Sequence, residues 1–524
     1  MNNNKPKNNS FKNFIKSKIL TKTFGYSALA VLGTVALTGA LVHKYSGRAK
    51  YKPSFYNYQS YIDDDSKRVI NENFTFKEFE EIQHFTKSIL TNKAAGGIGN
   101  DAQAVQLIRD GKLRKIDYAK MFNDPKYKDR EKVLELLSDT VKEHIKSYDK
   151  FLTKDQCIES DGTVAKEDKH LIDYFAPYFS QDMVVAYNPQ KVLKLNYNDA
   201  YYHAKITAHE QAIQEHLLKV SENKGEFRLI DIMKALTLKG YNYWEATYAM
   251  RDNMIYGSAY VKDPVKGYID DHATGKGSTP DKPNWYKEHI DHFVELFQHG
   301  TNYSIRDTEH VVFNGDGQWL LNNLINPTTK TNAGLIYNGD ALDAYFSEDN
   351  FENKVQQGTL RFFRPKINLL LVDGLVISEN TSDHFADLIY ESAHKSFLSG
   401  VERNDWNNGP KWVKKIDPKN GEDISEFENI EEYKSLLTFD HVGYTPAWKN
   451  LYNYVKDNYF DKVKEEKQKN YIASLYEIGK EQKIYGSDDT TIKATYEVKH
   501  FPIEPESKKT QAEIKVYYDT KLKS

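Results

Sequence analysis

The sequence predicts an α/β fold divided into two lobes or two domains. At 524 residues the chain is long enough to bury two sizeable hydrophobic cores, since one domain usually holds about 100 to 200 residues. Beyond residue 49, short apolar runs alternate with longer amphipathic stretches, which is the order of strands and helices in an α/β protein. Hydrophobic residues make up 39% of the chain and charged residues 28%, the composition of an ordinary globular body.

The first element is an apolar segment preceded by lysines. Residues 24–42, reading FGYSALAVLGTVALTGALV, carry no charge and have about the length of a helix that crosses a hydrocarbon core of about 30 Å. Lysines precede this segment, and the first acidic residue is Asp63, which is the charge pattern of a cytoplasmic N-terminus followed by an exported body. We expect a single-pass transmembrane anchor; the small residues at 38–40 leave a cleaved signal helix as the alternative.

Charge and cysteine content exclude several classes of function. The formal net charge of -3 provides no basic stripe, so nucleic acid is not expected as a partner. The single cysteine, Cys157, excludes an internal disulfide framework and a CxxC metal site. No cysteine follows the apolar segment closely, so a lipid-anchored form is not expected.

The exported part begins near residue 50. Its expected strands cover 54–58, 183–187, 334–337 and 369–377, and its expected helices cover 101–109, 130–151, 201–220, 285–299, 382–398 and 446–467. Clusters of Gly, Pro, Asn and Asp at 264–284, 314–317 and 407–421 predict loops, and the first is long enough to be an insertion. The tail from about residue 504 is charged and poor in apolar residues, so we expect it to be peripheral.

Two local motifs resemble catalytic or cofactor sites but lack the required spacing. His209 and Glu210 are followed by His216, whereas a zinc-binding helix needs its two histidines four residues apart on one face. The glycines at 96–99 have neither GxGxxG spacing nor a Walker lysine, and a strand-to-helix turn explains them. We therefore expect no metal, no cofactor and no nucleophile; a carboxylate pair of the glycosidase kind remains open.

Aromatic and polar residues gather at the end of the first expected strand. Residues 55–62 read FYNYQSYI, and the carboxyl ends of strands are where open α/β sheets bind ligands. This segment resembles the first strand and loop of the spermidine/putrescine-binding proteins of bacterial polyamine ABC importers. Five further segments resemble that family in the same order along the chain: 100–117, 172–192, 249–257, 333–341, and 368–377 with 443–446.

The resemblance implies a two-lobed periplasmic binding protein fold of type II. The chain would pass between the lobes twice, near Tyr178 and near Arg364. The division implied is a cytoplasmic basic segment at 1–23, an anchor or signal helix at 24–42, lobe 1 at 50–178 and 367–435, lobe 2 at 179–366 and 436–500, and a charged tail at 501–524.

The resemblance also implies a ligand pocket. Its expected binding residues are Tyr58, Gln59, Ser60, Tyr61, Asp252, Tyr337 and Asp373. Aromatic rings would pack against the methylenes of an amine and attract its ammonium groups, and the two aspartates would accept charge-assisted hydrogen bonds. Ser60, Ala249 and Leu371 depart from the family's pocket, which allows a ligand of lower charge or of another shape.

The function implied is that of a membrane-tethered, extracellular or periplasmic solute-binding protein that performs no chemistry on its ligand. Its partners would be a polyamine or related cation, an ABC permease with its ATPase, and the membrane. Two alternatives stay open at this point. One is a membrane-anchored extracellular glycoside hydrolase that uses a carboxylate pair. The other is an adhesion or scaffold protein that keeps the fold with a collapsed cleft.

Overall fold

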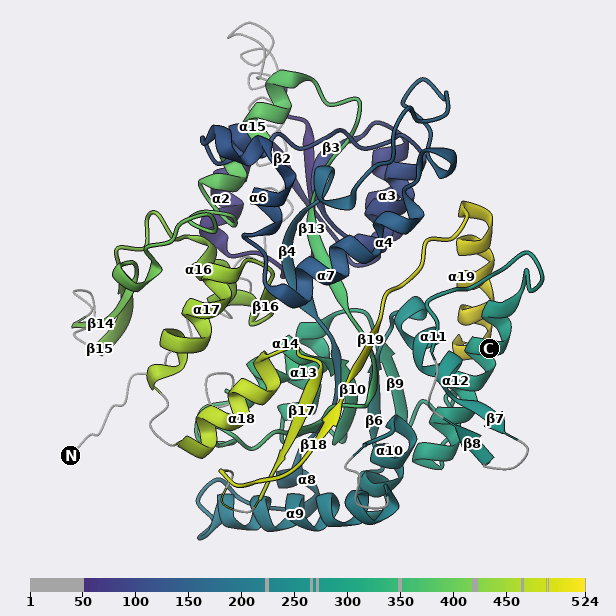
Figure 1. Ribbon diagram of the computed structural model, residues 1–524. Coiled ribbons are helices and arrows are strands. Elements are labelled where there is room, and N and C mark those ends of the chain that lie inside the picture. The colour runs from purple at the N-terminus through teal and green to yellow at the C-terminus, as the bar shows by residue number, and fades with distance from the viewer. Residues whose placement is uncertain are drawn as a thin grey trace, which may run out of the picture. The chain divides into compact units, whose positions relative to one another are not determined.

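The computed structural model describes residues 51–523 apart from 222–225, 264–266, 270–272, 347–350, 417–422, 463–465, 487 and 489. The expected apolar helix at 24–42 lies outside these residues. Where the chain is described, no helix is both long enough and apolar enough to cross a membrane. Pro53–Ser524 group into one unit, which holds two separate main sheets (Figure 1).

The first sheet has six strands in the order β16-β4-β13-β3-β1-β2. Their bounds are β1 Ser54–Tyr58, β2 Thr75–Phe79, β3 Ala94–Asn100, β4 Ala176–Gln181, β13 Leu371–Ile377 and β16 Thr445–Pro446. β1 runs parallel to β2 and β3, whereas β13 runs antiparallel to both β3 and β4. Every residue of β4 and β13 is buried, as expected for central strands covered on both faces.

The second sheet has five strands in the order β11-β5-β10-β6-β9. Their bounds are β5 Met183–Tyr187, β6 Trp244–Thr247, β9 Val311–Asn314, β10 Ala333–Tyr337 and β11 Arg361–Phe363. β6 runs parallel to β9 and β10, and β5 runs antiparallel to β10 and β11. β13 in the first sheet and β5 in the second therefore each run antiparallel to both of their neighbours. The first sheet with its helices is called the first lobe below, and the second sheet with its helices the second lobe. The chain enters β13 and β5 each directly from the other lobe. The expected α/β class is confirmed.

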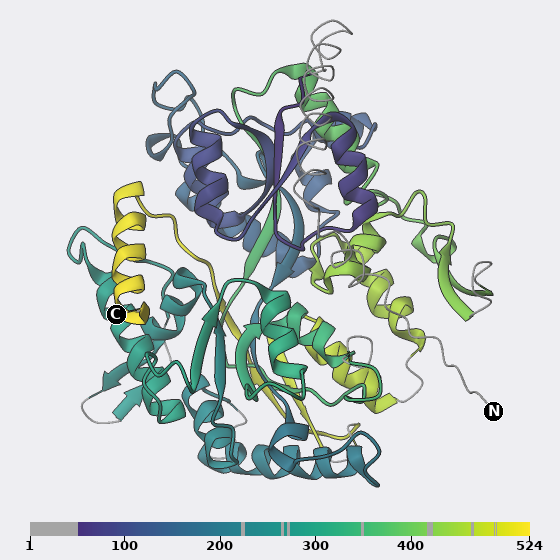
Figure 2. The same ribbon diagram turned by 180° about the vertical axis from the view of Figure 1, so that it is seen from behind.

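Helices cover the faces of the first sheet (Figures 1 and 2). Those of the first lobe include α2 Asp64–Asn73, α3 Ile82–Leu90, α4 Asp101–Arg109, α5 Tyr118–Met121, α6 Arg130–Leu134, α7 Asp139–Ser147, α15 Asp383–His394, α16 Ser435–Val442 and α17 Lys449–Asn458. Local capping determines where several of them begin. The side chain of Asn100 accepts a hydrogen bond from Gln103 N at 2.8 Å, so β3 ends and α4 begins at one residue.

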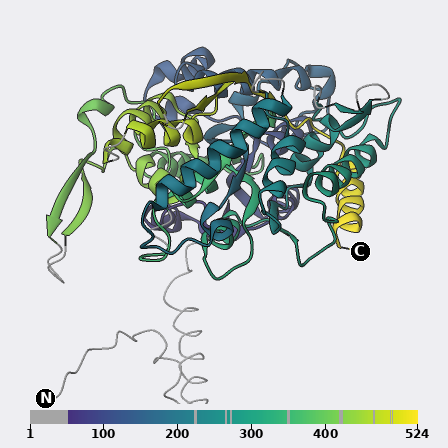
Figure 3. The ribbon, with the colours of Figure 1, turned by 90° about the horizontal axis from the view of Figure 1, so that it is seen from below.

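The second lobe has its own helices and two small hairpins. The helices are α8 Pro189–Leu193, α9 Tyr202–Val220, α10 Leu229–Leu238, α11 Met250–Ala259, α12 Trp285–Thr301, α13 Gly317–Ile325, α14 Asn338–Tyr345, α18 Glu466–Tyr476 and α19 Lys508–Lys523. The hairpins are β7 Val261–Asp263 with β8 Gly267–Ile269, and β17 Glu481–Tyr485 with β18 Ile492–Glu497. A third hairpin, β14 Lys411–Ile416 with β15 Asp423–Glu428, projects away from the helices of the first lobe (Figure 3).

Buried charges join the chain segments that pass between the two lobes. Asp182 lies between β4 and β5, and its carboxylate is 2.9 Å from the guanidinium of Arg364, which follows β11. Asn368 in β12 (Ile367–Leu369) accepts a hydrogen bond from Met183 N at 3.1 Å. His500 in β19 (Lys499–Phe501) lies 3.0 Å from the same aspartate. Asp182 is fully buried and Arg364 is 2% exposed, so neither charge is solvated by bulk water.

Most expected elements form where the sequence indicated. The loop expected at 407–421 instead contains strand β14, and three other elements also need correction. The helix expected at 130–151 is divided, because the chain leaves helical geometry after α6 and a new helix, α7, begins at the cap residue Ser138. The helix expected at 446–467 ends at Asn458. The glycines at 96–99 lie inside β3 rather than in a turn. A Cβ on Gly97 would be 2.2 Å from the carbonyl oxygen of Tyr56, so the close approach of β1 requires glycine there.

The C-terminal part differs most from expectation. β16 pairs with β4 of the first sheet, and α17 packs beside it, so the first lobe extends beyond residue 435. Helix α18 packs on α14 of the second lobe, and residues 499–501 lie alongside β12 as strand β19. The tail at 501–524 is not peripheral, because Ile514 and Tyr518 of α19 are buried against the second lobe.

We expect the variant Asp182→Ala to be strongly destabilised, because it leaves the Arg364 guanidinium buried without its carboxylate. The expected loss in free energy of unfolding is roughly 3 to 5 kcal/mol, measured by urea denaturation. Glu135→Ala, which removes an exposed carboxylate 2.9 Å from Lys132, is the control and should change the value by less than about 0.5 kcal/mol. Equal losses in the two variants would contradict a structural role for the buried pair.

Candidate functional site

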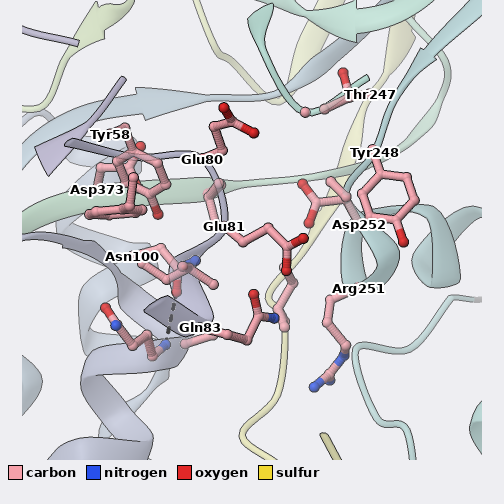
Figure 4. A pocket seen from close by; sticks show the side chains of 18 of the residues that line it. Tyr58, Glu80, Glu81, Gln83, Asn100, Thr247, Tyr248, Arg251, Asp252 and Asp373 are labelled. Atoms are coloured by element: carbon pink, nitrogen blue, oxygen red, sulfur yellow. Dashed lines mark hydrogen bonds between the residues drawn. The ribbon is translucent and has the colours of Figure 1, made fainter. Parts of the chain in front are cut away.

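A cavity of about 360 Å³ lies where the carboxyl ends of strands from both sheets meet. Tyr58 ends β1 and Asn100 ends β3 on the first-lobe side, and Thr247 ends β6 and Tyr337 ends β10 on the second-lobe side. Figure 4 shows Tyr58 and Asp373 on one side of the cavity, Thr247, Tyr248, Arg251 and Asp252 on the other, and Glu80 and Glu81 between them. Ligands of open α/β sheets bind at such strand ends.

The first-lobe wall is built around the buried carboxyl group of Asp373. Its Oδ2 atom accepts hydrogen bonds from Tyr61 Oη at 2.8 Å and from Gln181 Nε2 at 2.7 Å. The ring of Tyr58 meets that of Tyr61 edge-on, with centroids 5.5 Å apart. Burial raises the pKa of Asp373 to about 8, because the carboxylate loses its hydration and the charges of Asp101 and Asp252 repel it.

The second-lobe wall provides two more buried carboxyl groups. Asp252, near the start of α11, accepts a hydrogen bond from Tyr337 Oη at 2.9 Å. Asp340, in the first turn of α14, accepts one at 2.5 Å from Tyr444 Oη, which comes from the first lobe. Burial raises the pKa of Asp252 to about 6 and that of Asp340 to about 7. All three carboxyl groups therefore lie in surroundings that disfavour their negative charge.

Several acceptor atoms around the cavity receive no hydrogen bond from the described residues. They are Asp373 Oδ1, Asp340 Oδ2 and the side-chain carbonyl oxygen of Gln181. Buried polar atoms normally have partners, so these acceptors are available to a ligand or a water molecule that donates hydrogen bonds. Within the described chain, no lysine or arginine nitrogen lies within 4.0 Å of Asp252, Asp340 or Asp373, so a cation would find these carboxyl groups unneutralised.

The cavity lining is acidic overall, which favours a positively charged ligand. Its acidic residues are Glu80, Glu81, Asp110, Asp252, Asp316, Asp340, Asp343, Asp373, Glu504 and Glu506, against the basic residues Arg251, Lys508 and Lys515. Tyr58, Tyr61, Tyr248, Tyr337 and Tyr444 add aromatic surface. Carboxylates between aromatic rings suit an organic cation with apolar methylenes, because the rings pack against carbon and attract ammonium groups.

The structure brings all seven predicted binding residues to this one cavity. Tyr61, Asp252 and Asp373 are buried in its walls, and Tyr58 and Tyr337 are half-buried. Gln59 and Ser60 are exposed at its edge, where Ser60 has a positive φ of 55° in the turn after β1. Ala249 and Leu371, where the sequence departs from the polyamine-binding pattern, also line the cavity.

Sequence reasoning missed Gln181, Asp340 and Tyr444. Asp340 follows Tyr337 by three residues in the YNGDA phrase. An acidic residue in the first helical turn after a strand end could have indicated a site residue. Tyr444 lies in the segment 443–446 that resembles the polyamine-binding family, but no local signal pairs it with Asp340, which lies 104 residues earlier in the chain. His209 and Glu210 lie elsewhere: the histidine ring lies against Tyr241, and the carboxylate is 3.4 Å from Arg361.

One family model matches most of the chain. The model of a family described as hypothetical lipoprotein (MG045 family) matches residues 31–524. No curated protein matches the chain.

Several solved structures are similar at low sequence identity. A spermidine/putrescine ABC transporter protein of Listeria monocytogenes aligns with a TM-score of 0.46 and 10% identity, over 90% of this chain and 99% of that chain. The spermidine/putrescine substrate-binding protein of Streptococcus pneumoniae aligns with a TM-score of 0.41 and 11% identity, over 90% and 100%. The binding protein MotA of A. tumefaciens B6, in complex with glucopine, has the same values.

The raised pKa of Asp373 predicts how stability without ligand depends on pH. An unfolded aspartate has a pKa of about 3.9, so between about pH 4 and pH 8 the folded protein keeps a proton that the unfolded chain has released. The contribution of Asp373 to stability therefore falls as pH rises through this range. We expect the thermal midpoint of the wild type to fall more steeply from pH 5 to pH 8 than that of Asp373→Asn. Parallel curves for the two proteins would contradict the raised pKa.

Proposed function

The chain belongs to the MG045 family of hypothetical lipoproteins, and we propose that it is the solute-binding component of an ABC importer for a polyamine such as putrescine or spermidine. The observation that carries the proposal is the group of three buried carboxyl groups, Asp252, Asp340 and Asp373, which face one aromatic cavity without a basic partner among the described residues. A linear amine with two or more ammonium groups supplies both the positive charges and the hydrogen-bond donors that these acceptors need.

The arrangement of the cavity supports a binding role rather than catalysis. Each carboxyl group is held by a tyrosine, and Asp373 lies on the first lobe whereas Asp252 and Asp340 lie on the second. A ligand that contacts both walls has more affinity for a closed arrangement of the lobes than for an open one, and this difference draws the lobes together. The closed form would then dock on a permease, and no bond of the ligand would be made or broken.

The proposed location is the outer face of the membrane. It rests on the apolar residues 24–42 with lysines before them and on the lipoprotein description of the family. Cys157 is buried and lies far along the chain from the apolar residues, so a helical tether rather than a lipid on cysteine is the form of attachment that we propose. In this proposal, the lobes correspond to the two halves of a type II binding protein.

Calorimetric titration of the exported part with putrescine and spermidine tests the proposal. We expect stoichiometric binding, and we expect Asp373→Asn to weaken it roughly 10- to 100-fold, because one charge-assisted hydrogen bond is lost. Asp387→Asn is the matched control, since it removes an exposed carboxylate from α15 of the same lobe, outside the cavity. Absence of heat and of thermal stabilisation with any polyamine would contradict the proposal, and turnover of a glycoside would favour a hydrolase.

Binding of an amine should also release protons near neutral pH. Asp373 and Asp340, with pKa values of about 8 and about 7, are largely protonated at pH 6, whereas a bound ammonium group favours their ionised forms. The amine itself stays protonated, since the pKa of an alkylammonium such as lysine is about 10.4. The dissociation constant should therefore fall as pH rises from 6 to 8. Titrations in two buffers of different ionisation enthalpy measure the released protons, and no release would contradict this linkage.

A further inference from the structure

The C-terminal segment forms one edge of the cavity. β19 pairs in parallel with β12 where the chain passes between the lobes, and the residues after it line the cavity as far as Lys515 in α19. Figure 1 shows this segment in yellow, running upward from the strands at the centre and turning into α19. Tyr148 Oη of the first lobe donates a hydrogen bond to Ile503 O at 3.0 Å, so the segment is attached to the first lobe just before it reaches the cavity.

Beyond that point the second lobe holds the segment firmly. The Glu506 carboxylate accepts hydrogen bonds from Gly277 N at 2.6 Å and from Ser278 N at 2.9 Å. Asn253 Nδ2 of α11 donates to Tyr518 Oη of α19 at 2.7 Å, and Tyr518 is 1% exposed. These contacts fix the helix on α11 and α12, so the side chains that it directs toward the cavity have defined positions.

The ammonium group of Lys515 lies in surroundings that resemble those expected for a bound amine. Its Nζ atom is 3.0 Å from Glu81 Oε2 and 3.6 Å from Asp519 Oδ2. It also lies 5.9 Å from the ring centroid of Tyr248. Lys515, Glu81 and Tyr248 all line the cavity, and Figure 4 shows Glu81 extending from the first-lobe side toward Asp252. Two carboxylates and an aromatic face are what an alkylammonium group binds.

Two sets of carboxyl groups in the cavity differ in whether a basic side chain pairs with them: the inner set is Asp252, Asp340 and Asp373, and the outer set is Glu81 and Asp110. Asp252, Asp340 and Asp373 are buried and have no basic side chain within 4.0 Å in the described part of the chain. Glu81, in contrast, is more than one-third exposed and is paired with Lys515. Asp110 is likewise paired, with Lys508 Nζ at 2.9 Å from its Oδ2 atom. Both lysines come from α19, so the C-terminal helix neutralises the outer end of an otherwise acidic cavity.

We propose that Lys515 is a specificity-determining residue whose tethered ammonium group occupies the outermost cation position of the cavity. A ligand with two ammonium groups fits the inner carboxyl groups and leaves the pair of Lys515 and Glu81 in place. A longer triamine or tetramine has to displace Lys515 to reach Glu81. The helix thereby selects a diamine over longer polyamines. This inference rests on the proposed function, because it concerns which amine the same cavity prefers.

The decisive experiment compares Lys515→Ala with Lys521→Ala. Lys521 lies on the same helix, and its Nζ atom is 2.6 Å from Asp291 of the second lobe, so its removal makes the same charge change away from the cavity. Calorimetry gives the ratio of the dissociation constants for putrescine and spermidine. In Lys515→Ala we expect the affinity for spermidine, relative to that for putrescine, to rise about threefold to fivefold, which is the scale of one partly exposed ion pair. Lys521→Ala and Lys515→Arg should keep the wild-type ratio.

A second measurement tests the outer cation position without relying on the inner site. Butylammonium chloride, compared with sodium chloride at the same concentration, should raise the thermal midpoint of Lys515→Ala more than that of the wild type or of Lys521→Ala.

The outcomes separate the two claims. If the wild type binds amines but Lys515→Ala keeps the wild-type ratio, or gains no extra stabilisation from butylammonium, the role of Lys515 is overturned and the proposed function stands. If neither the wild type nor any variant binds a polyamine, both are overturned.

Discussion

The arrangement of the cavity depends on the buried pair of Asp182 and Arg364. Removing two charges from water is costly, and the cost is recovered only where the geometry is close and the remaining polar atoms are bonded. Here Arg364 also donates to the carbonyl oxygens of Ser474 and Leu475, and His500 approaches the same aspartate. One buried charge pair thus joins chain segments that come from four distant parts of the sequence.

This junction lies next to the residues that form the cavity. Asp182 follows Gln181, which donates to Asp373, and the backbone N–H of Asp182 donates at 3.1 Å to Asn338, the neighbour of Tyr337. The buried pair of Asp182 and Arg364 therefore helps to fix the two walls of the cavity relative to the chain segments that connect the lobes. Because the ends of both sheets meet there, the carboxyl groups of the two lobes face one space rather than separate surfaces.

The burial of these carboxyl groups also bears on the function that we propose. A buried carboxyl group ionises poorly because it lacks hydration. A bound ammonium group favours the ionised form, because it compensates for that loss. Asp373, Asp340 and Asp252 share this condition, although each lies beside a different tyrosine. Lys515 places such a charge at the outer end of the cavity, beside Glu81.

The amino-acid sequence by itself determined the α/β class, the positions of most strands and helices, and the strand-end residues of the cavity. These follow from local patterns: apolar runs, caps such as Asn100, and aromatic or acidic residues next to a strand end. The resemblance to polyamine-binding proteins added Asp252 and Asp373, and the structure brings both to the cavity together with Tyr58, Tyr61 and Tyr337.

Only the tertiary structure decided which groups meet. Tyr61 and Asp373 are 312 residues apart, and Asp340 and Tyr444 are 104 apart. Neither local pattern nor spacing encodes such pairs, because they depend on how the lobes pack. The C-terminal tail shows the same limit. Its charged composition indicated a peripheral segment, yet Ile514 and Tyr518 bury one face of α19 and direct Lys515 to the cavity. A helix with few apolar residues can still be held in place when those few lie on the face that packs.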